Sequence, residues 1–145
     1  MDNPVDVAFT PSALRRFGRA WVGLSVVLGL HVVDETLTGF LSVYNPTVRA
    51  ARARFGWFPM PEFTFGVWLT GLCLLVMVLL ALSPLAFRGA RALRVFAYPY
   101  AIIMVSNGIG HLLGSIYFGR WVPGATTAPL LLVTSMWLLY SVRKL

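Results

Sequence analysis

Residues 63–83, FTFGVWLTGLCLLVMVLLALS, form a run of 21 residues without a formal charge. A helix of about 20 apolar residues spans the roughly 30 Å hydrocarbon core of a bilayer. Three further stretches, residues 21–44, 95–118 and 124–142, contain no Lys or Arg and are also long enough to cross. We therefore predict an all-α integral membrane protein whose four transmembrane helices pack as a bundle.

The composition agrees with a single membrane domain over residues 1–145. The chain is 58% hydrophobic and 12% charged, which is too apolar for an ordinary soluble domain. Its formal net charge of +7 comes from basic clusters that lie between the apolar stretches, as topology signals do, so we exclude nucleic-acid binding. Cys73 is the only cysteine, and no internal disulfide can form.

The basic residues also predict an orientation. With four spans, eight of them share one side of the membrane and four share the other, and Lys and Arg are retained on the cytoplasmic side. Both termini are then cytoplasmic. Asn45 and Pro46 are expected to end the first helix at Tyr44. Residues 46–55 fit a short helix along the outer interface and a plain loop about equally well.

Polar residues gather on one face of the first and of the third span. His31, Asp34 and Glu35 project from the same side of a helix, and Thr38 continues that face. Asn107 and His111 lie four residues apart on the third span and share a face with Tyr100 and Ser115. The small residues Ser106, Gly110 and Gly114 flank His111, and we expect a neighbouring helix to approach there.

Both polar faces are expected at the same depth, because the two spans run in the same direction from a cytoplasmic arginine cluster. His31 and Glu35 follow Arg19 by 12 and 16 residues, while Asn107 and His111 follow Arg94 by 13 and 17. At about 1.5 Å per residue this offset is small beside the reach of a side chain. The sequence therefore predicts one intramembrane site.

Something must neutralise the two carboxylates, since an ionised carboxylate in hydrocarbon costs at least about 2.5–3.5 kcal/mol. No Lys or Arg lies within any span to pair with them. Protonation of the carboxyls, an imidazolium at His31 or His111, or a bound metal ion could each neutralise them. A divalent cation, zinc, iron or manganese, satisfies the most groups at once, because imidazole and carboxylate oxygen are usual ligands of these metals. The candidate ligands are His31, Asp34, Glu35, His111 and Asn107.

The leading hypothesis is a metal-dependent membrane enzyme that acts on a small apolar or lipid-like substrate. Asp34, Glu35, His31 and His111 would be catalytic, and Asn107, Tyr100 and Thr38 would contact the substrate. A metal-free acid-base isomerase or cyclase explains the same residues. A third hypothesis is a protein that transports a metal ion or protons. A fourth is a purely structural network in which these residues hydrogen-bond the helices together. The sequence leaves the oligomeric state open, including a homo-oligomer.

Residues outside this constellation receive simpler predictions. Glu62 is expected to be a solvated carboxylate at the membrane interface. Thr126 and Thr127 follow Pro123 and Gly124 and are expected to begin the last helix.

The chain resembles the HXXEE-domain family of small bacterial membrane proteins. That family carries a His-x-x-Glu-Glu motif in its first hydrophobic segment, then Asn-x-x-x-His, then Pro-Gly followed by Thr-Ala. The corresponding stretches here are HVVDE at 31–35, NGIGH at 107–111 and PGATTA at 123–128. Asp34 stands where the family name has Glu. The shorter side chain makes Asp34 a candidate to support a ligand rather than to bind directly. The resemblance implies a multi-pass protein of the bacterial inner membrane and implies no particular reaction.

Overall fold

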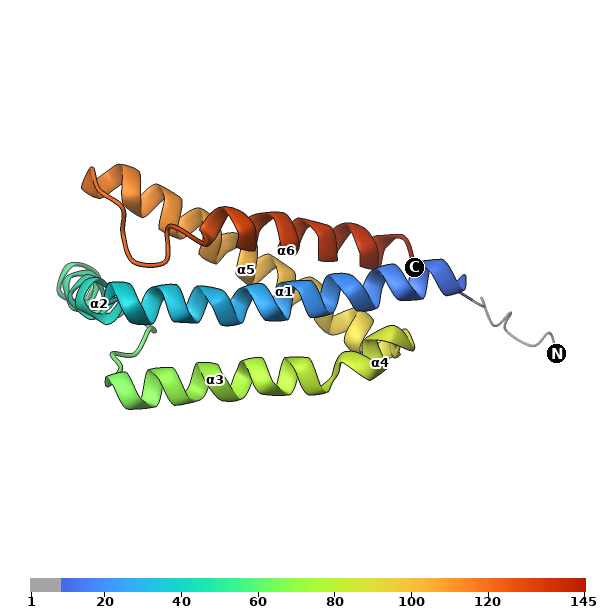
Figure 1. Ribbon diagram of the computed structural model, residues 1–145. Coiled ribbons are helices and arrows are strands. Elements are labelled where there is room, and N and C mark those ends of the chain that lie inside the picture. Colours follow the sequence, from blue (N-terminus) through green and yellow to red (C-terminus); the bar gives the residue numbers. More distant parts are fainter. Residues whose placement is uncertain (1–8) are drawn as a thin grey trace.

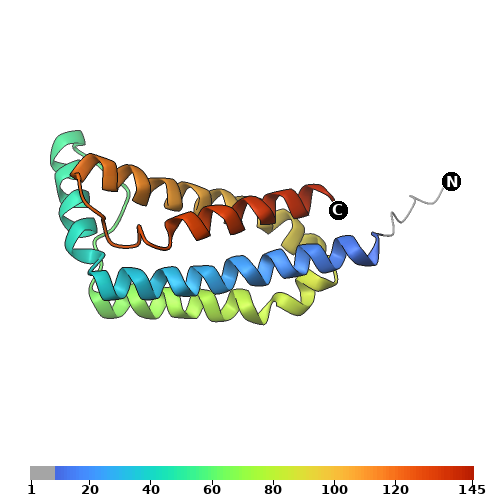
Figure 2. The same cartoon turned by 45° about the horizontal axis from the view of Figure 1, so that its top comes forward.

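A computed structural model describes residues 9–145, and this part of the chain contains helices and turns but no strand. The helices are α1 (Pro11–Thr38), α2 (Leu41–Phe55), α3 (Phe65–Ala81), α4 (Ser83–Phe87), α5 (Arg91–Phe118) and α6 (Ala128–Arg143). α1 and α5 run in one direction, and α3 and α6 run in the other (Figure 1). α2 lies across the end of the bundle at which α1 and α5 finish (Figure 2).

Three helical segments are long and apolar enough to cross a membrane: Pro11–Thr38, Phe65–Phe87 and Arg91–Phe118. α6 is also apolar but has only 16 residues. α3 exposes most of its apolar side chains, among them Val67, Leu74 and Met77. A helix that is apolar all round and not covered by protein is matched to lipid rather than to water.

The first helix, α1, ends at Thr38 and is capped by Gly39, so the prediction that Asn45 and Pro46 end it at Tyr44 is wrong. Gly39 adopts a left-handed conformation with φ 78°, which a residue with a side chain rarely takes. The chain turns there and α2 begins at Leu41, with Pro46 inside it. The helix expected over residues 46–55 is therefore the later part of α2.

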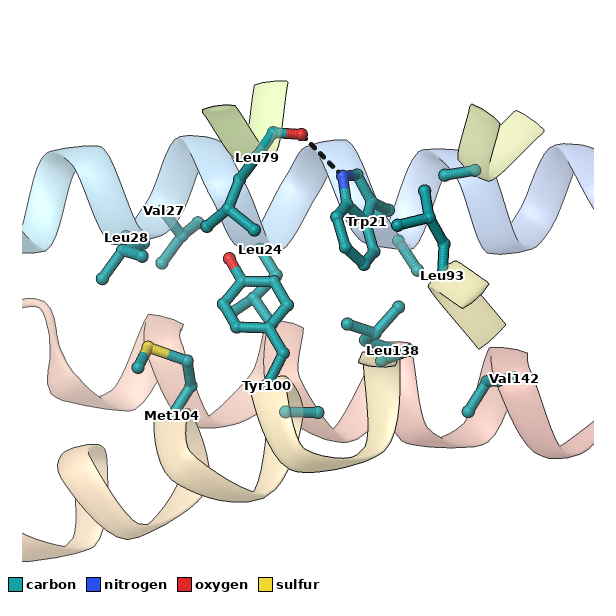
Figure 3. Packing of buried hydrophobic residues seen from close by; sticks show 14 of the residues in the cluster. Trp21, Leu24, Val27, Leu28, Leu79, Leu93, Tyr100, Met104, Leu138 and Val142 are labelled. Atoms are coloured by element: carbon teal, nitrogen blue, oxygen red, sulfur yellow. Dashed lines mark hydrogen bonds between the residues drawn. The ribbon is translucent and has the colours of Figure 1, made fainter. Parts of the chain in front are cut away.

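Trp21 links three helices in the hydrophobic core (Figure 3). Its side chain is fully buried, and its Nε1 donates a hydrogen bond to the backbone oxygen of Leu79 at 2.8 Å. Its ring meets the ring of Tyr100 edge-on, with centroids 5.5 Å apart. Trp21 thereby joins α1 to α3 and α5 in the half of the bundle away from α2 (Figures 1 and 3).

The close approach of a helix to α5 occurs at Gly108, not at the predicted stripe of small residues. A Cβ atom on Gly108 would lie 2.8 Å from Leu132 Cγ and 3.2 Å from the backbone oxygen of Ala128, both on α6. A Cβ atom on Gly110 would meet nothing within 4 Å. The prediction missed Gly108 because the stripe was aligned with His111, whereas α6 packs on the neighbouring face of α5.

Gly108→Val should therefore destabilise the protein, whereas Gly110→Val should not. The clash at position 108 involves backbone of α6 and should cost about 1–3 kcal/mol or more, as overpacking does. The two variants are heated in the same mild detergent, and the midpoint temperature is measured from the loss of the monodisperse fraction. Equal midpoints for both would contradict this packing.

Candidate metal centre

His31, Glu35 and His111 meet near the end of the bundle that α2 crosses. Each histidine lies seven residues, about 10 Å, before the end of its own helix, α1 or α5. Because these helices run in the same direction, the rings lie at one level, as the sequence predicts. Their centroids are 4.8 Å apart, and all three side chains are buried.

The three potential ligand atoms face one another. His31 Nε2 lies 3.2 Å from His111 Nε2, and Glu35 Oε1 lies 3.2 Å from His111 Nε2 and 3.6 Å from His31 Nε2. Three donors held tetrahedrally at 2.0–2.1 Å from one ion lie about 3.3–3.4 Å apart. The side chains therefore present donors at a spacing that suits a shared metal ion.

Asp34 does not join this group but reaches it through Thr127. Asp34 Oδ2 accepts hydrogen bonds from the Thr127 backbone N–H at 3.0 Å and from its hydroxyl at 2.9 Å. The same hydroxyl oxygen lies 2.7 Å from His31 Nδ1. Since the hydroxyl proton is directed to Asp34, the oxygen accepts from Nδ1–H. This tautomer leaves a lone pair on His31 Nε2, which is the form that binds a metal.

The segment between α5 and α6 loops back alongside the bundle before α6 begins (Figure 1), and it covers the centre. Val122, Pro123, Gly124 and Ala125 are buried, and the Val122 N–H donates to Ser115 Oγ at 3.2 Å. Gly124 has φ 84°, and a Cβ atom there would lie 2.7 Å from His111 Cε1 and 3.0 Å from Glu35 Cγ. Only glycine fits this contact. The return of the chain into the bundle also explains why α6 begins as late as Ala128.

An apolar cavity of about 380 Å³ adjoins the centre. It lies between α2, the segment before α3, α5 and the α5–α6 connection, and His111 and Asn107 form part of its wall. The Asn107 side chain also lies beside His31. Its Oδ1 is buried. Asn107 thus borders both the cavity and the candidate ligands.

Side chains of α2 hold the outer wall of this cavity. The Asn45 amide exchanges two hydrogen bonds with the backbone of Phe63, at 2.9 and 3.1 Å. Arg52 donates to the backbone oxygen of Met60 at 2.5 Å and, with Arg49, forms an ion pair with Glu62. Glu62 is therefore a partly exposed, paired carboxylate that anchors the segment from Gly56 to Thr64.

Two residues expected to contact a substrate lie elsewhere. Tyr100 is in the core, where its hydroxyl is 3.5 Å from Ser25 Oγ. It precedes His111 by 11 residues, about 16 Å along the helix. Thr38 is exposed and donates to the backbone oxygen of Asp34 at 2.5 Å. The structure brings neither of them to the histidines.

Thr127 is the residue of the site whose contacts the sequence did not reveal. It stands just before α6, as expected of a helix start, but its side chain makes no capping bond to that helix. Its hydroxyl bonds to α1 instead. The PGATTA stretch was the available signal, because it groups Thr127 with Gly124, the other residue that reaches the centre.

One of three comparisons with known proteins found a match. A family model described as "Protein of unknown function with HXXEE motif" matches residues 21–138. The chain belongs to the HXXEE family. Searches of curated proteins and of solved structures each found no match. Within the HXXEE motif of this chain, the final acidic residue, Glu35, contacts His31 and His111, while Asp34 at the position before it contacts Thr127.

Thr127→Val should lower the stability by about 1–3 kcal/mol, because it removes a buried hydroxyl that links Asp34 to His31. Valine keeps the shape of threonine. Thermal or denaturant unfolding in detergent measures the change. Thr126→Val is the matched control, since Thr126 is exposed and should change the stability by less than about 0.5 kcal/mol. Thr127→Ser should restore most of the loss, and indistinguishable stabilities for the Val pair would contradict the link.

Proposed function

We propose that this protein is a membrane-embedded enzyme with a divalent metal centre at His31, Glu35 and His111, and that it acts on an apolar substrate. The observation that carries the proposal is the convergence of two Nε2 atoms and one carboxylate oxygen at 3.2–3.6 Å in a buried place. Two histidines and one glutamate are a ligand set that catalytic zinc sites use, with a further position left for water or substrate. Iron and manganese accept the same donors.

Charge balance favours a cation at this place. Glu35 and Asp34 together bring two negative charges into apolar surroundings, and no Lys or Arg side chain bonds to either one among residues 9–145. A divalent cation makes the group neutral, which removes most of the cost of burying it. Without an ion, the same cluster reaches neutrality only by protonation of its carboxyl or imidazole groups.

The adjoining cavity favours catalysis over a purely structural ion. Structural metal sites are closed by four protein ligands, whereas catalytic sites keep an open position. His111 and Asn107 belong both to the surroundings of the centre and to the cavity wall. A bound metal would polarise a substrate oxygen or activate water. Asp34 and Thr127 would hold the His31 ring in place, and Asn107 would orient the substrate.

The proposed setting is the bacterial inner membrane, with four spans and cytoplasmic termini. α6 and the buried residues before it would form the fourth span. The starts of α1 and α5, with α4 and the end of α6, lie together at one end of the bundle (Figure 1). These segments contain or adjoin eight of the twelve basic residues, which favours that end as the cytoplasmic one. The centre would then lie in the outer half of the bilayer.

The purified protein should contain close to one metal ion per chain after expression with zinc, iron and manganese supplied. His31→Ala, His111→Ala and Glu35→Gln should each lower the metal content at least tenfold, because each removes a ligand. Asp34→Asn should retain the ion but bind it about 10–100-fold more weakly, as loss of a supporting hydrogen bond does. Elemental analysis in mild detergent and competition with a chelator provide these numbers.

Thr126→Val is the control for the purification and should match the wild type. Each variant should first be shown to be monodisperse, so that loss of metal is not loss of fold. A folded wild-type protein that holds no metal under these conditions contradicts the proposal. Metal flux into proteoliposomes above that of empty vesicles would contradict the enzymatic part and favour transport.

A further inference from the structure

We propose that a hollow at the end of the bundle away from the metal centre binds the head group of an anionic phospholipid. Arg91 and Arg94, at the start of α5, hold the phosphate, and the apolar face of α5 that follows them receives an acyl chain. This inference goes beyond the proposed function, because it concerns a different site and does not depend on a metal ion.

The hollow has a volume of about 320 Å³ and lies between the start of α5 and the end of the chain. It is lined from α5 by Arg91, Arg94, Val95 and Tyr98, and from the end of α6 and the residues after it by Val142 and Leu145. At 3.6 residues per turn, the four residues of α5 share one face of that helix. Two arginine side chains, one turn apart, therefore stand beside the same hollow.

Neither arginine has an acidic partner in the part of the chain that the structure describes. The ion pairs of residues 9–145 involve Glu35 and Glu62, which both lie at the other end of the bundle (Figure 1). The guanidinium carbon of Arg94 lies 4.5 Å from the centroid of the Phe9 ring. This contact orients the side chain but supplies no anion. The charges of Arg91 and Arg94 thus remain available to a ligand.

The surroundings of the hollow select a head group with a net negative charge. Eight of the twelve basic residues lie in or next to the segments at this end. Asp2 and Asp6 precede the described residues, and eight positive charges less these two still leave at least +6. Guanidinium groups bind a phosphate through paired N–H donors. The ammonium group of a zwitterionic lipid would be repelled by the same charges.

The face of α5 that follows the arginines selects a lipid over a soluble anion. Val95, Tyr98 and Ile102 continue the stripe that the two arginines begin, and they are 64%, 38% and 53% exposed. α5 is one of the helices long and apolar enough to cross a membrane. Two charges followed by exposed apolar surface match the order of phosphate and acyl chain in a phospholipid. Basic pockets between membrane helices are a usual place for anionic head groups.

The test measures the binding of phosphatidylglycerol to the full-length protein in mild detergent by native mass spectrometry. Phosphatidylcholine with the same acyl chains is the comparison. The wild type should bind phosphatidylglycerol at least tenfold more tightly, and Arg91→Gln/Arg94→Gln should reduce this preference to twofold or less. Arg91→Gln alone changes an exposed residue and should weaken phosphatidylglycerol binding about fivefold, the contribution of one arginine near a membrane surface. Equal binding of the two lipids by the wild type would overturn the proposal.

Arg15→Gln/Arg19→Gln is the matched control for the loss of charge. It removes two positive charges from the same end of the bundle, but Arg15 and Arg19 are exposed residues of α1 that do not line the hollow. The control should weaken phosphatidylglycerol binding less than threefold. An equal loss in the two double variants would overturn the site, because binding would then follow the general charge of this end.

Two further measurements separate the lipid from other occupants. Glycerophosphoglycerol, the head group without acyl chains, should not displace bound phosphatidylglycerol even in large excess, and displacement would overturn a lipid in favour of a soluble anion. Asp2→Asn/Asp6→Asn should leave the affinity for phosphatidylglycerol within twofold of the wild type. A rise of tenfold or more would identify the acidic N-terminal segment as the occupant of the hollow and overturn the proposal.

Discussion

Two adjacent carboxylates in apolar surroundings must each find a partner, and the arrangement of this end of the bundle follows from that need. Glu35 meets His31 and His111, which fixes α1 against α5. Asp34 accepts from the backbone and the hydroxyl of Thr127, which draws the segment before α6 inwards. Because Thr127 also contacts His31, the hydrogen bonds of Asp34 and the contacts of Glu35 with the histidines form one connected group. Three parts of the chain that are distant in sequence are thereby held at one level.

The features predicted correctly from the sequence are those that depend on periodicity and length. Long runs without charge gave the all-helical fold and the three helices that can span a membrane. The meeting of His31, Glu35 and His111 followed from helix geometry, because equal distances from the arginine clusters place residues of two parallel helices at equal depth. Both arguments need only the rise and the twist of a helix.

The errors concern choices that depend on distant neighbours. A glycine and a proline both interrupt helices, and the chain turned at Gly39 while α2 accommodated Pro46. The face of α5 that packs on α6 contains Gly108, and this could not be known before the position of α6 was known. Tyr100 lies on the expected side of α5 but too far along its axis. Thr127 is 93 residues from Asp34, and no local pattern reports such a contact.

Gly124 has no functional group, yet it touches both a histidine and the glutamate of the centre. Any side chain there would collide with His111 and Glu35, so the backbone of the α5–α6 segment packs this closely on both only because residue 124 is glycine. The space beside Gly110, in contrast, is open, so the backbone is packed tightly against the candidate ligands on one side and loosely along the cavity on the other.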